Sequence, residues 1–473
     1  MGIEILGLIF GDLEISIILL LLGALLAVSL GESKYRIAIS GSSIVLLIAA
    51  LAVIILKPFN AGVLNFDEFT RFFAVIFLFT SILIITAMHK ELSDVPRYGL
   101  SVMLILIANI GMIIAASSLN IVYIILGWEL AGLSTYALVA SRRTDPLSIE
   151  AAMKFFIVGV IGFGLSLLGI SFLFGALGTL DLDQMAQLLT NGEFNVRLLY
   201  TGIALLIAGM GFKMAIVPFH VWIPDTYEGA PNTITSFLAA ASKTMAFAVA
   251  LRIFYRGLAP VSYIWVPIFA ILALITMTYA NLAALAQTKM KRLLAWSSIA
   301  HAGYIILLFG AFGESVRLIA GGLFHILMHA LMKILAFIAA IYITTVIGSD
   351  LIEEYAGLGR SQKFVAFALT VDLLAMAGIP PLAGFWSKYL LFMGVVDTGY
   401  AWLALAAVIN SAISLYYYAR VIKIMYFDVG KAAELKMTGP RIYYIAIVIT
   451  FLIIMLAGIY PDPIIDYLES ISP

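Results

Sequence analysis

Five lysines lie inside or at the edge of long apolar segments, where a charged side chain is costly. An ammonium group in a bilayer costs at least about 2.5–3.5 kcal/mol, so it must find a partner, reach trapped water or release its proton. Lysine can lose its proton when it is desolvated, whereas arginine keeps its charge. No arginine is expected inside these segments, and the pattern predicts a proton relay through Lys154, Lys213, Lys243, Lys333 and Lys388.

Glu129 lies about halfway along the apolar segment 119–140, in Ile-Leu-Gly-Trp-Glu-Leu-Ala-Gly-Leu. A carboxylate beside a lysine favours the protonated amine, and separation of the two favours proton release. Movement of such a pair can therefore load and eject a proton. We expect Lys213 to be the partner of Glu129 and Lys243 to be the next proton carrier; the alternative is a neutral, hydrogen-bonded carboxylic acid that packs helices.

Histidines and a lysine add a second polar group further along the chain. His301 lies in the segment 293–312, and histidine is suited to a relay near neutral pH, although a satisfied core histidine is the alternative. His325, His329 and Lys333 follow one another at intervals of four residues and so share one helix face. No HEXXH glutamate or third ligand accompanies them, so we expect a polar stripe along an internal water path and no metal site.

Other ionisable residues have less certain roles. Lys154 follows Glu150 by one helical turn, so either a local ion pair or modulation of the Glu129–Lys213 pair is open. Asp372 is a further acid inside an apolar segment, with no role assigned. Asp225 and Glu228 follow the segment of Lys213 and fit either an entrance or a turn.

Two of the lysines stand beside helix breaks. Pro218 and Pro224 follow Lys213, and Pro380 and Pro381 precede Lys388. Each proline removes a backbone donor, so the helix breaks and leaves carbonyls that only protein or trapped water can satisfy. The same combination recurs five segments later, which predicts two five-helix repeats in inverted topology.

The composition determines the class of protein that positions these side chains. The chain has 473 residues, of which 63% are hydrophobic and only 11% charged, against a usual charged share of about 25%. We therefore predict an all-α polytopic membrane protein with about 14 transmembrane helices, two inverted five-helix repeats and broken helices 7 and 12. Zero net charge suggests no nucleic-acid partner, and the absence of cysteine excludes thiolate-held iron–sulfur clusters and disulfides on this chain.

The apolar runs also suggest a division into four parts. The first three helices occupy 1–97, the two repeats occupy 98–255 and 256–422, and the last connection and helix occupy 423–473. Basic residues gather in alternate loops, beginning with the loop after the first segment. By the positive-inside rule, both termini lie outside the cell.

Three motifs resemble the antiporter-like subunits of respiratory complex I. They are Gly-Trp-Glu-Leu at 127–130, Lys-Met-Ala-Ile-Val-Pro-Phe-His-Val-Trp-Ile-Pro-Asp-Thr-Tyr-Glu-Gly-Ala-Pro at 213–231 and Ala-Gly-Ile-Pro-Pro-Leu-Ala-Gly-Phe-Trp-Ser-Lys at 377–388. The second motif is most similar to the N subunit, and the match runs from about residue 60 to 460. The resemblance implies 14 helices with inverted repeats. It also implies that Glu129, Lys213 and Lys243 carry protons and that Lys388 is the exit residue, which is lysine in N-type members.

The resemblance further implies a proton-translocating membrane-arm subunit of an NADH or F(420)H(2):quinone-type oxidoreductase, in a prokaryotic cell membrane. Its partners would be M-, L-, K-, A-, J- and H-like membrane subunits and a peripheral redox arm that holds the iron–sulfur clusters, flavin and quinone; this chain would hold no cofactor. One departure is the Phe-His-x-x-x-His-x-x-x-Lys run at 324–333, which looks more like M- and L-type subunits, or Mrp antiporter and membrane hydrogenase relatives, than like typical bacterial N subunits. The alternatives are an Mrp-type cation/proton antiporter subunit and a membrane-bound hydrogenase subunit.

Overall fold

The computed structural model describes residues 3–5, 8–10, 12–31, 33–56, 64–92, 95, 97–192, 194–434 and 439–471. The chain divides into two compact units. Unit 1 consists of Met1–Met214, Gly229–Ile264 and Ser472–Pro473, and unit 2 of Ala215–Glu228 and Trp265–Ile471. The division into four parts stays a prediction.

The predicted membrane segments are confirmed. Within the described ranges, 13 helices are long and apolar enough to cross a membrane, and a broken pair, α17 (Lys363–Ala377) and α18 (Ala383–Asp397), supplies the remaining predicted segment. A short hairpin of β1 (Ile3–Ile5) and β2 (Leu8–Phe10) precedes them. In unit 1 the spans are α1 (Asp12–Leu30), α2 (Arg36–Leu56), α3 (Glu68–Glu91), α4 (Tyr98–Ser117), α5 (Ile121–Val139), α6 (Pro146–Leu177), α8 (Val196–Met214) and the composite span Asn232–Gly257.

Outside the spans, unit 1 holds the surface helix α7 (Leu182–Asn191). The spans of unit 2 are α13 with α14 (Met290–Ile305 and Leu307–Gly310), α15 (Val316–Ile347), α19 (Ala401–Phe427) and α20 (Arg441–Ile459). One span, α12 (Ser262–Leu285), begins in unit 1 and continues into unit 2. Short helices α9 (Trp222–Gly229), α16 (Leu358–Ser361) and α21 (Asp462–Glu469) connect or end the elements.

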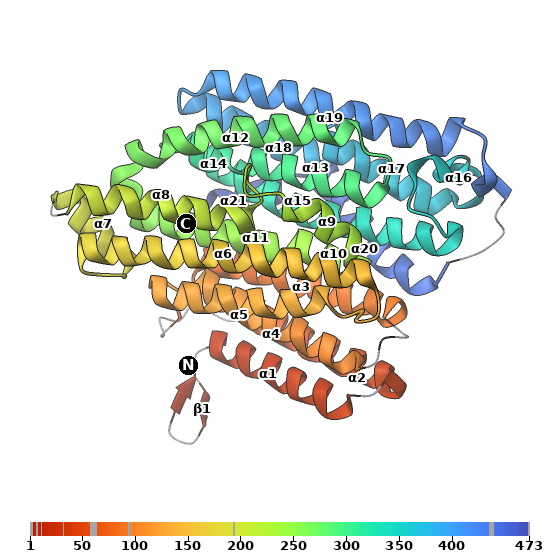
Figure 1. Ribbon diagram of the computed structural model, residues 1–473, viewed down its shortest axis with the longest axis horizontal. Helices are drawn as coiled ribbons and strands as arrows, with labels where there is room; N and C mark the ends of the chain where they lie inside the picture. The colour runs from red at the N-terminus through yellow and green to blue at the C-terminus, as the bar shows by residue number, and fades with distance from the viewer. Residues whose placement is uncertain are drawn as a thin grey trace. The chain divides into compact units, whose positions relative to one another are not determined.

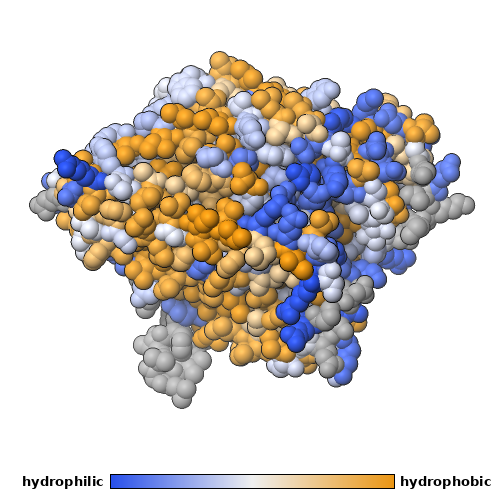
Figure 2. All heavy atoms as spheres, in the orientation of Figure 1, coloured by the Kyte–Doolittle hydropathy of each residue, from blue (hydrophilic) through white to orange (hydrophobic). Residues whose placement is uncertain are grey.

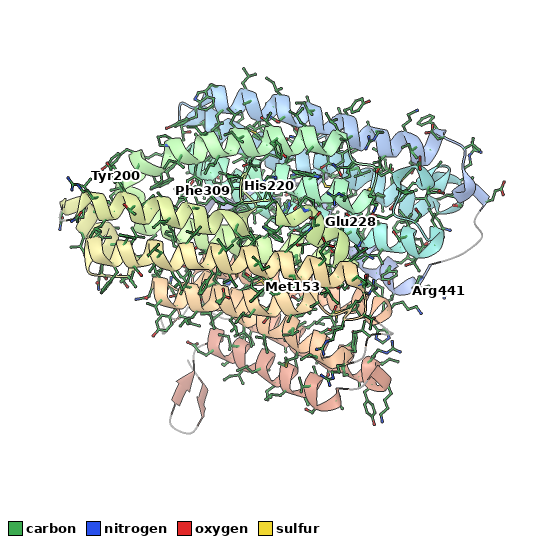
Figure 3. The ribbon with its side chains drawn as sticks, in the orientation of Figure 1. Met153, Tyr200, His220, Glu228, Phe309 and Arg441 are labelled. Atoms are coloured by element: carbon green, nitrogen blue, oxygen red, sulfur yellow. The ribbon has the colours of Figure 1, made fainter. Side chains whose placement is uncertain are left out.

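Helix α6 shows how unit 1 meets both lipid and protein. Asp145 caps its first turn with Pro146 at the first helical position, and Gly178 ends it with a φ of +74°. Apolar side chains such as Met153, Ile157 and Ile161 cover its outer face, which appears as hydrophobic surface in Figure 2; Met153 is labelled in Figure 3. Such a face needs a lipid or protein neighbour, which identifies the chain as an integral membrane protein.

The inner face of α6 lies along α8, as Figure 1 shows. Glycines on both helices permit this approach: a Cβ atom at Gly169 would lie 2.9 Å from the Gly202 carbonyl oxygen, and one at Gly209 would lie 2.5 Å from the Gly162 carbonyl oxygen. Small residues let membrane helices pack backbone against backbone. This packing fixes α8, and therefore Lys213 near its end, against α6.

The composite span that carries Lys243 departs from ordinary helical geometry. It comprises α10 (Asn232–Phe237), the π-helix η2 (Leu238–Ser242), α11 (Lys243–Leu251) and the π-helix η3 (Arg252–Gly257). The π-helical turn ends at the residue before Lys243. Such turns are rare and occur mostly at functional sites.

The expectation that these segments contain no arginine is wrong at Arg252. The eighth span runs on to Gly257 instead of ending near residue 251, so Arg252 lies within it and is fully buried. Its guanidinium pairs with Asp67 at 2.7 Å and donates to the Ala116 carbonyl oxygen at 3.1 Å. Because it is paired, this arginine keeps its charge, and we assign it a structural role.

In unit 2, α15 is the central helix. It packs against α13, α17, α18 and α20, and almost all of its residues are buried. The chain leaves α17 at Gly378, which has a φ of +88°, and enters α18 after Pro380 and Pro381. The break predicted from these prolines is therefore confirmed, and so is the break after Lys213. There α8 ends at Met214, Ala215 has a φ of +69°, and helix resumes only in α9.

The crossing of α4 and α5 yields a test of the fold. A Cβ atom at Gly127 would lie 2.5 Å from the Gly111 carbonyl oxygen and 2.6 Å from the Ala115 nitrogen, both backbone atoms that cannot move away. We expect Gly127→Ala to destabilise the protein by about 1–3 kcal/mol. Gly164→Ala, where nothing lies within 4 Å, should be neutral or slightly stabilising. Thermal unfolding in detergent compares them, and equal stability of the two variants would contradict this account of the crossing.

Candidate functional site

Buried Lys213 and half-buried Glu129 form the ionisable centre of unit 1. Lys213 lies in the last turn of α8 and is 2% exposed, and Glu129 lies on α5, which packs against α6. The two groups interact electrostatically, yet Lys213 Nζ and Glu129 Oε2 have no hydrogen-bond partner in the described part of the chain. The two groups are therefore near enough to interact but do not form an ion pair, and their role as a proton-carrying pair stays a prediction.

Aromatic rings hold the Lys213 amine in this position. Nζ lies 5.4 Å from the ring centre of Tyr136 and 5.4 Å from that of Phe155, which is the distance of a cation–π contact. The two rings pack edge to face, 4.7 Å apart, and the Tyr136 ring lies against Gly159 of α6. The quadrupoles of these rings stabilise the ammonium form without a counter-ion. Lys213 can thus hold a proton while Glu129 is apart from it.

Lys243 lies in the first turn of α11 and is 2% exposed. Helix α11 packs against α3, α4, α5 and α8, all of unit 1, so the helices that carry Glu129 and Lys213 both border it. Unit 1 therefore brings the three predicted residues into one group of packed helices.

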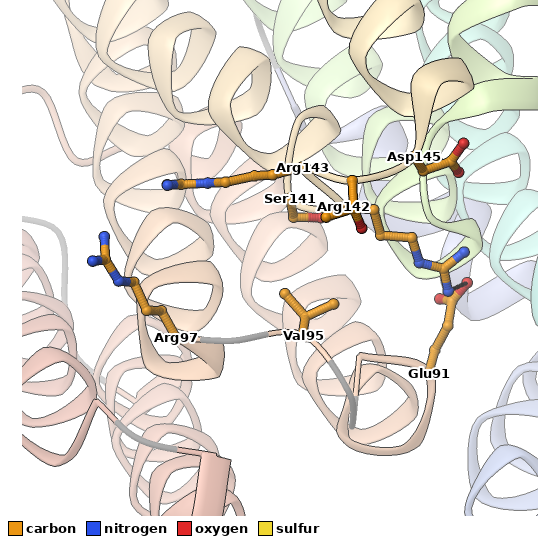
Figure 4. A pocket seen from close by; sticks show the side chains of 8 residues that line it. Glu91, Val95, Arg97, Ser141, Arg142, Arg143 and Asp145 are labelled. Atoms are coloured by element: carbon orange, nitrogen blue, oxygen red, sulfur yellow. Dashed lines mark ion pairs between the residues drawn. The ribbon is translucent and has the colours of Figure 1, made fainter.

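Glu91, which the sequence analysis missed, fixes the start of the Lys243 span. Its carboxylate accepts hydrogen bonds from the backbone nitrogens of Asn232 and Thr233, both at 2.7 Å. An acid at a helix N-terminus satisfies free donors and complements the helix dipole. Arg142, from the loop after α5, pairs with the same carboxylate at 3.6 Å. Glu91 and Arg142 line a hollow of about 610 Å³, shown in Figure 4 with Arg97 and Arg143.

Lys154 has a local partner. Its Nζ lies 2.7 Å from Glu150 Oε1, and the two side chains are 43% and 60% exposed. The ion pair on one exposed helix face accords with the first of the two predicted readings. An exposed pair of this kind contributes little to stability.

In unit 2, a hydrogen-bonded series runs from His301 through His325 to Ser387, whereas His329 bonds Ser298 at 3.3 Å. His301 Nδ1 lies 3.1 Å from His325 Nε2, and His325 Nδ1 lies 3.0 Å from Ser387 Oγ. The rings of His301 and His325 stack with centres 5.2 Å apart, and that of His329 lies 5.6 Å from His301. Histidine can give one proton and accept another through its two nitrogens. The series ends at Ser387, whose neighbour in the chain is Lys388.

Lys388 caps the broken helix. Its Nζ donates to the carbonyl oxygens of Met376 at 2.8 Å and Ala377 at 3.2 Å, the last residues of α17, and to Ser411 Oγ at 2.9 Å. The C-terminus of a helix carries a partial negative charge, so these carbonyls stabilise an ammonium ion without any carboxylate. The break at Gly378 is what exposes them.

Beside Lys388, a hollow of about 380 Å³ has mostly apolar walls. They include Phe385, Tyr389 and Met393.

Lys333 begins a second hydrogen-bonded series in unit 2. Its Nζ donates to Ser297 Oγ at 2.7 Å, and Ser297 bonds Tyr418 Oη. Tyr417, the neighbour of Tyr418, donates to Asn281 Oδ1 at 3.0 Å, and Asn281 Nδ2 donates to Tyr304 Oη at 3.1 Å. The Tyr304 ring lies 4.9 Å from Lys388 Nζ. Polar side chains thus lead from Lys333 to the Tyr304 ring, which lies beside Lys388.

The acids that follow the break after α8 belong to an ion cluster. Glu228, labelled in Figure 3, pairs with Lys289 and Arg292, both at 2.6 Å, and Asp225 pairs with Arg292 at 3.1 Å. This cluster fastens α9 to the start of α13, which favours a structural turn over an entrance.

No group of three or more metal-binding side chains occurs among the described residues. What the sequence analysis missed is the set of neutral polar residues that joins the ionisable ones: Ser297, Ser387, Ser411, Asn281, Tyr304, Tyr417 and Tyr418. Each lies in a predicted apolar segment, and an asparagine or a serine there was an available signal. A tyrosine was not, because its ring is common in membrane helices.

Comparisons with known proteins show which family this chain is similar to. The family model for the transmembrane region of NADH:quinone oxidoreductase and Mrp antiporter subunits matches residues 118–414. The chain is 39% identical to F(420)H(2) dehydrogenase subunit N of Methanosarcina mazei over 85% of this chain and 83% of that protein. It is 35% identical to NADH-quinone oxidoreductase subunit N of Desulforamulus reducens, over 96% and 95%.

The fold is also that of a solved relative. A chain of respiratory complex I from Thermus thermophilus superposes with a TM-score of 0.80 at 29% identity, covering 96% of this chain and 99% of the other. The resemblance inferred from three motifs is therefore confirmed. The chain belongs to the NADH:quinone oxidoreductase/Mrp antiporter transmembrane family, as an antiporter-like subunit of N type.

Proposed function

We propose that this chain moves protons across a prokaryotic cell membrane as the N-type subunit of a complex I-like oxidoreductase. Electron transfer from NADH or reduced F(420) to a quinone or similar acceptor occurs on partner subunits and supplies the energy. This chain performs no redox chemistry, in keeping with its lack of cysteine. The named relatives, which are subunits of such oxidoreductases, support the proposal.

The observation that carries the proposal is the open Glu129–Lys213 pair. Glu129 is half-buried with its Oε2 buried, Lys213 is buried, and neither Oε2 nor Nζ has a hydrogen-bond partner in the described ranges, so the charged form of each group is costly. Approach of the two stabilises the ion pair, and separation favours the neutral amine, so relative motion of α5 and α8 changes where the proton resides. A redox-driven movement in a partner subunit can act on this equilibrium.

In the proposed sequence the proton passes from Lys213 to Lys243, then to His301, and leaves through Lys388. Within unit 2, the bonds from His301 to His325 and on to Ser387 support the later steps. At Lys388 the carbonyls of α17 hold the ammonium form until the proton departs. We assign His329 and Lys333 a supporting place in this path, and Lys154 none beyond its ion pair with Glu150.

The partners are proposed to be M-, L-, K-, A-, J- and H-like membrane subunits and a peripheral arm that holds the iron–sulfur clusters and flavin. Both termini are proposed to lie outside the cell, since basic residues gather in the loops of the other side. The loops on the proposed inner side, which carry most of the basic residues, contain Arg97, Arg142 and Arg143. These three arginines line one hollow in unit 1.

A second candidate is an Mrp-type cation/proton antiporter subunit, which works on ion gradients alone. The buried series of His325, His329 and Lys333 on α15 favours it, because that run resembles such antiporters. Purification from native membranes in mild detergent, followed by mass spectrometry, separates the two. Iron–sulfur and flavin subunits in constant proportion support the redox-driven pump, and small membrane partners without a redox protein contradict it.

Lys213→Met removes the titratable amine of unit 1. We expect at least a tenfold fall in proton translocation coupled to electron transfer, the factor that a barrier higher by about 1.4 kcal/mol produces. Proton uptake by proteoliposomes of the purified complex measures it. Lys423→Met is the matched control, since Lys423 is 69% exposed and pairs with Asp428; native pumping by the Lys213 variant would refute the proposal.

Lys388→Met removes the proposed exit group and leaves the carbonyls of Met376 and Ala377 without their donor. We expect translocation to fall about as far as in Lys213→Met, with the complex still assembled. Lys388→Gln keeps a donor for the carbonyls but cannot carry a proton, so it should pump as poorly. Recovery of pumping in the glutamine variant would mean that Lys388 serves only to cap α17.

A further inference from the structure

Asp372 is the one acid of α17 that lies inside the helix and away from its ends. It is fully buried, and neither of its carboxylate oxygens has a hydrogen-bond partner among the described residues. A carboxylate left in this condition is strongly destabilising unless it takes up a proton or a cation approaches it. A residue that only packs helices does not need this chemistry, so Asp372 calls for a functional account.

Lys333 is the cation that acts on Asp372. The two groups interact electrostatically across the contact between α15 and α17, although the structure records no ion pair between them in the described ranges. Met376 lies one turn after Asp372 on the same face of α17, and its sulfur lies 3.4 Å from Lys333 Nζ. The amine of Lys333 therefore lies against the face of α17 that carries Asp372.

The same turn of α17 joins Asp372 to the exit residue. Met376 contacts Lys333 through its sulfur and Lys388 through its carbonyl oxygen, at 2.8 Å. The two ammonium groups repel each other in this buried region, so protonation of one opposes protonation of the other. A nearby carboxyl group that can take a proton relieves this conflict.

Resting on the function proposed above, we propose that Asp372 and Lys333 form a second carboxylate–lysine pair, in unit 2, that transfers a proton during each pumping cycle. The Lys333 ammonium ion gives its proton to the Asp372 carboxylate, which leaves a neutral amine and a carboxylic acid. No other bond forms or breaks, and no electron moves. With Lys333 neutral, Lys388 can accept a proton from the histidine series; return of the Asp372 proton to Lys333 then expels the proton of Lys388.

The pair has the same design as Glu129 and Lys213 in unit 1. In both cases a lysine of one helix interacts with an acid of another helix, and the two do not form an ion pair. Atoms without a hydrogen-bond partner in the described ranges are Glu129 Oε2 and Lys213 Nζ in unit 1, and both carboxylate oxygens of Asp372 in unit 2. They differ in what holds the lysine: aromatic rings surround Lys213, whereas Ser297 accepts a hydrogen bond from Lys333.

The test is a double-mutant cycle in the purified complex, reconstituted in liposomes. We expect Asp372→Asn and Lys333→Met each to lower proton translocation at least about tenfold. The double variant should pump no worse than either single variant, because both substitutions block the same proton transfer. Asp372→Glu should restore pumping in part. The exposed pair Lys423 and Asp428 is the control, and variants Lys423→Met and Asp428→Asn should leave pumping unchanged.

Infrared difference spectra of the complex during turnover give an independent readout. If Asp372→Asn fails to assemble, the native complex alone can still refute the proposal, by showing no aspartic acid band. A carboxylic acid C=O band that shifts when aspartate is isotopically labelled, and that is absent in Asp372→Asn, supports the proposal. Native pumping by Asp372→Asn, multiplied losses in the double variant, or no aspartic acid band in the native complex would overturn it. Loss of pumping in Lys213→Met with none in Asp372→Asn would refute this inference alone, whereas native pumping in both would refute the proposed function.

Discussion

The constraint on which the structure depends is the cost of placing a charge in an apolar interior. Lys213, Lys243, Lys333 and Lys388 are each at most 4% exposed, and no carboxylate lies within ion-pair distance of Lys213, Lys333 or Lys388 in the described ranges. Neutral groups stabilise these amines instead: aromatic faces at Lys213, a serine at Lys333 and helix-end carbonyls at Lys388. Such partners tolerate the ammonium ion and its neutral form alike. A permanent ion pair, like that of Arg252 with Asp67, would keep the lysine protonated and prevent it from releasing its proton.

Breaks in the helices follow from the same constraint. An intact α17 would satisfy the carbonyls of Met376 and Ala377 internally and leave Lys388 with Ser411 but without these two acceptors. The left-handed turn at Gly378 and the two prolines after it free those carbonyls. The π-helical turn before Lys243 is another departure from α-helical geometry at a buried lysine. Elsewhere, as in α6 and α8, ordinary helices pack through glycine, which makes a rigid frame for these few irregular points.

Much of this could be predicted from the sequence because a membrane limits the choices. Apolar length located the spans, and Pro218 and Pro381 located the breaks. Burial of Lys213, Lys333 and Lys388 followed from their positions in those spans. What could not be predicted depends on pairing across helices. From the sequence, Arg252 is expected in a loop, because nothing near it in the chain shows that Asp67 pairs with it. Glu91 was missed because it accepts hydrogen bonds from backbone nitrogens, the first of which lies 141 residues later in the chain. Asp372 had no assigned role until its position relative to Lys333 was known.

The central claim is that the buried lysines carry protons, and are more than fixed positive charges. Replacement by arginine separates these possibilities, because arginine keeps the charge and cannot release its proton. Proton translocation per electron should therefore be measured in proteoliposomes of the complex with Lys213→Arg, beside the surface control Lys423→Arg. The account predicts that the Lys213 variant assembles and loses coupled translocation while the control pumps normally. Native translocation with arginine at position 213 would contradict it.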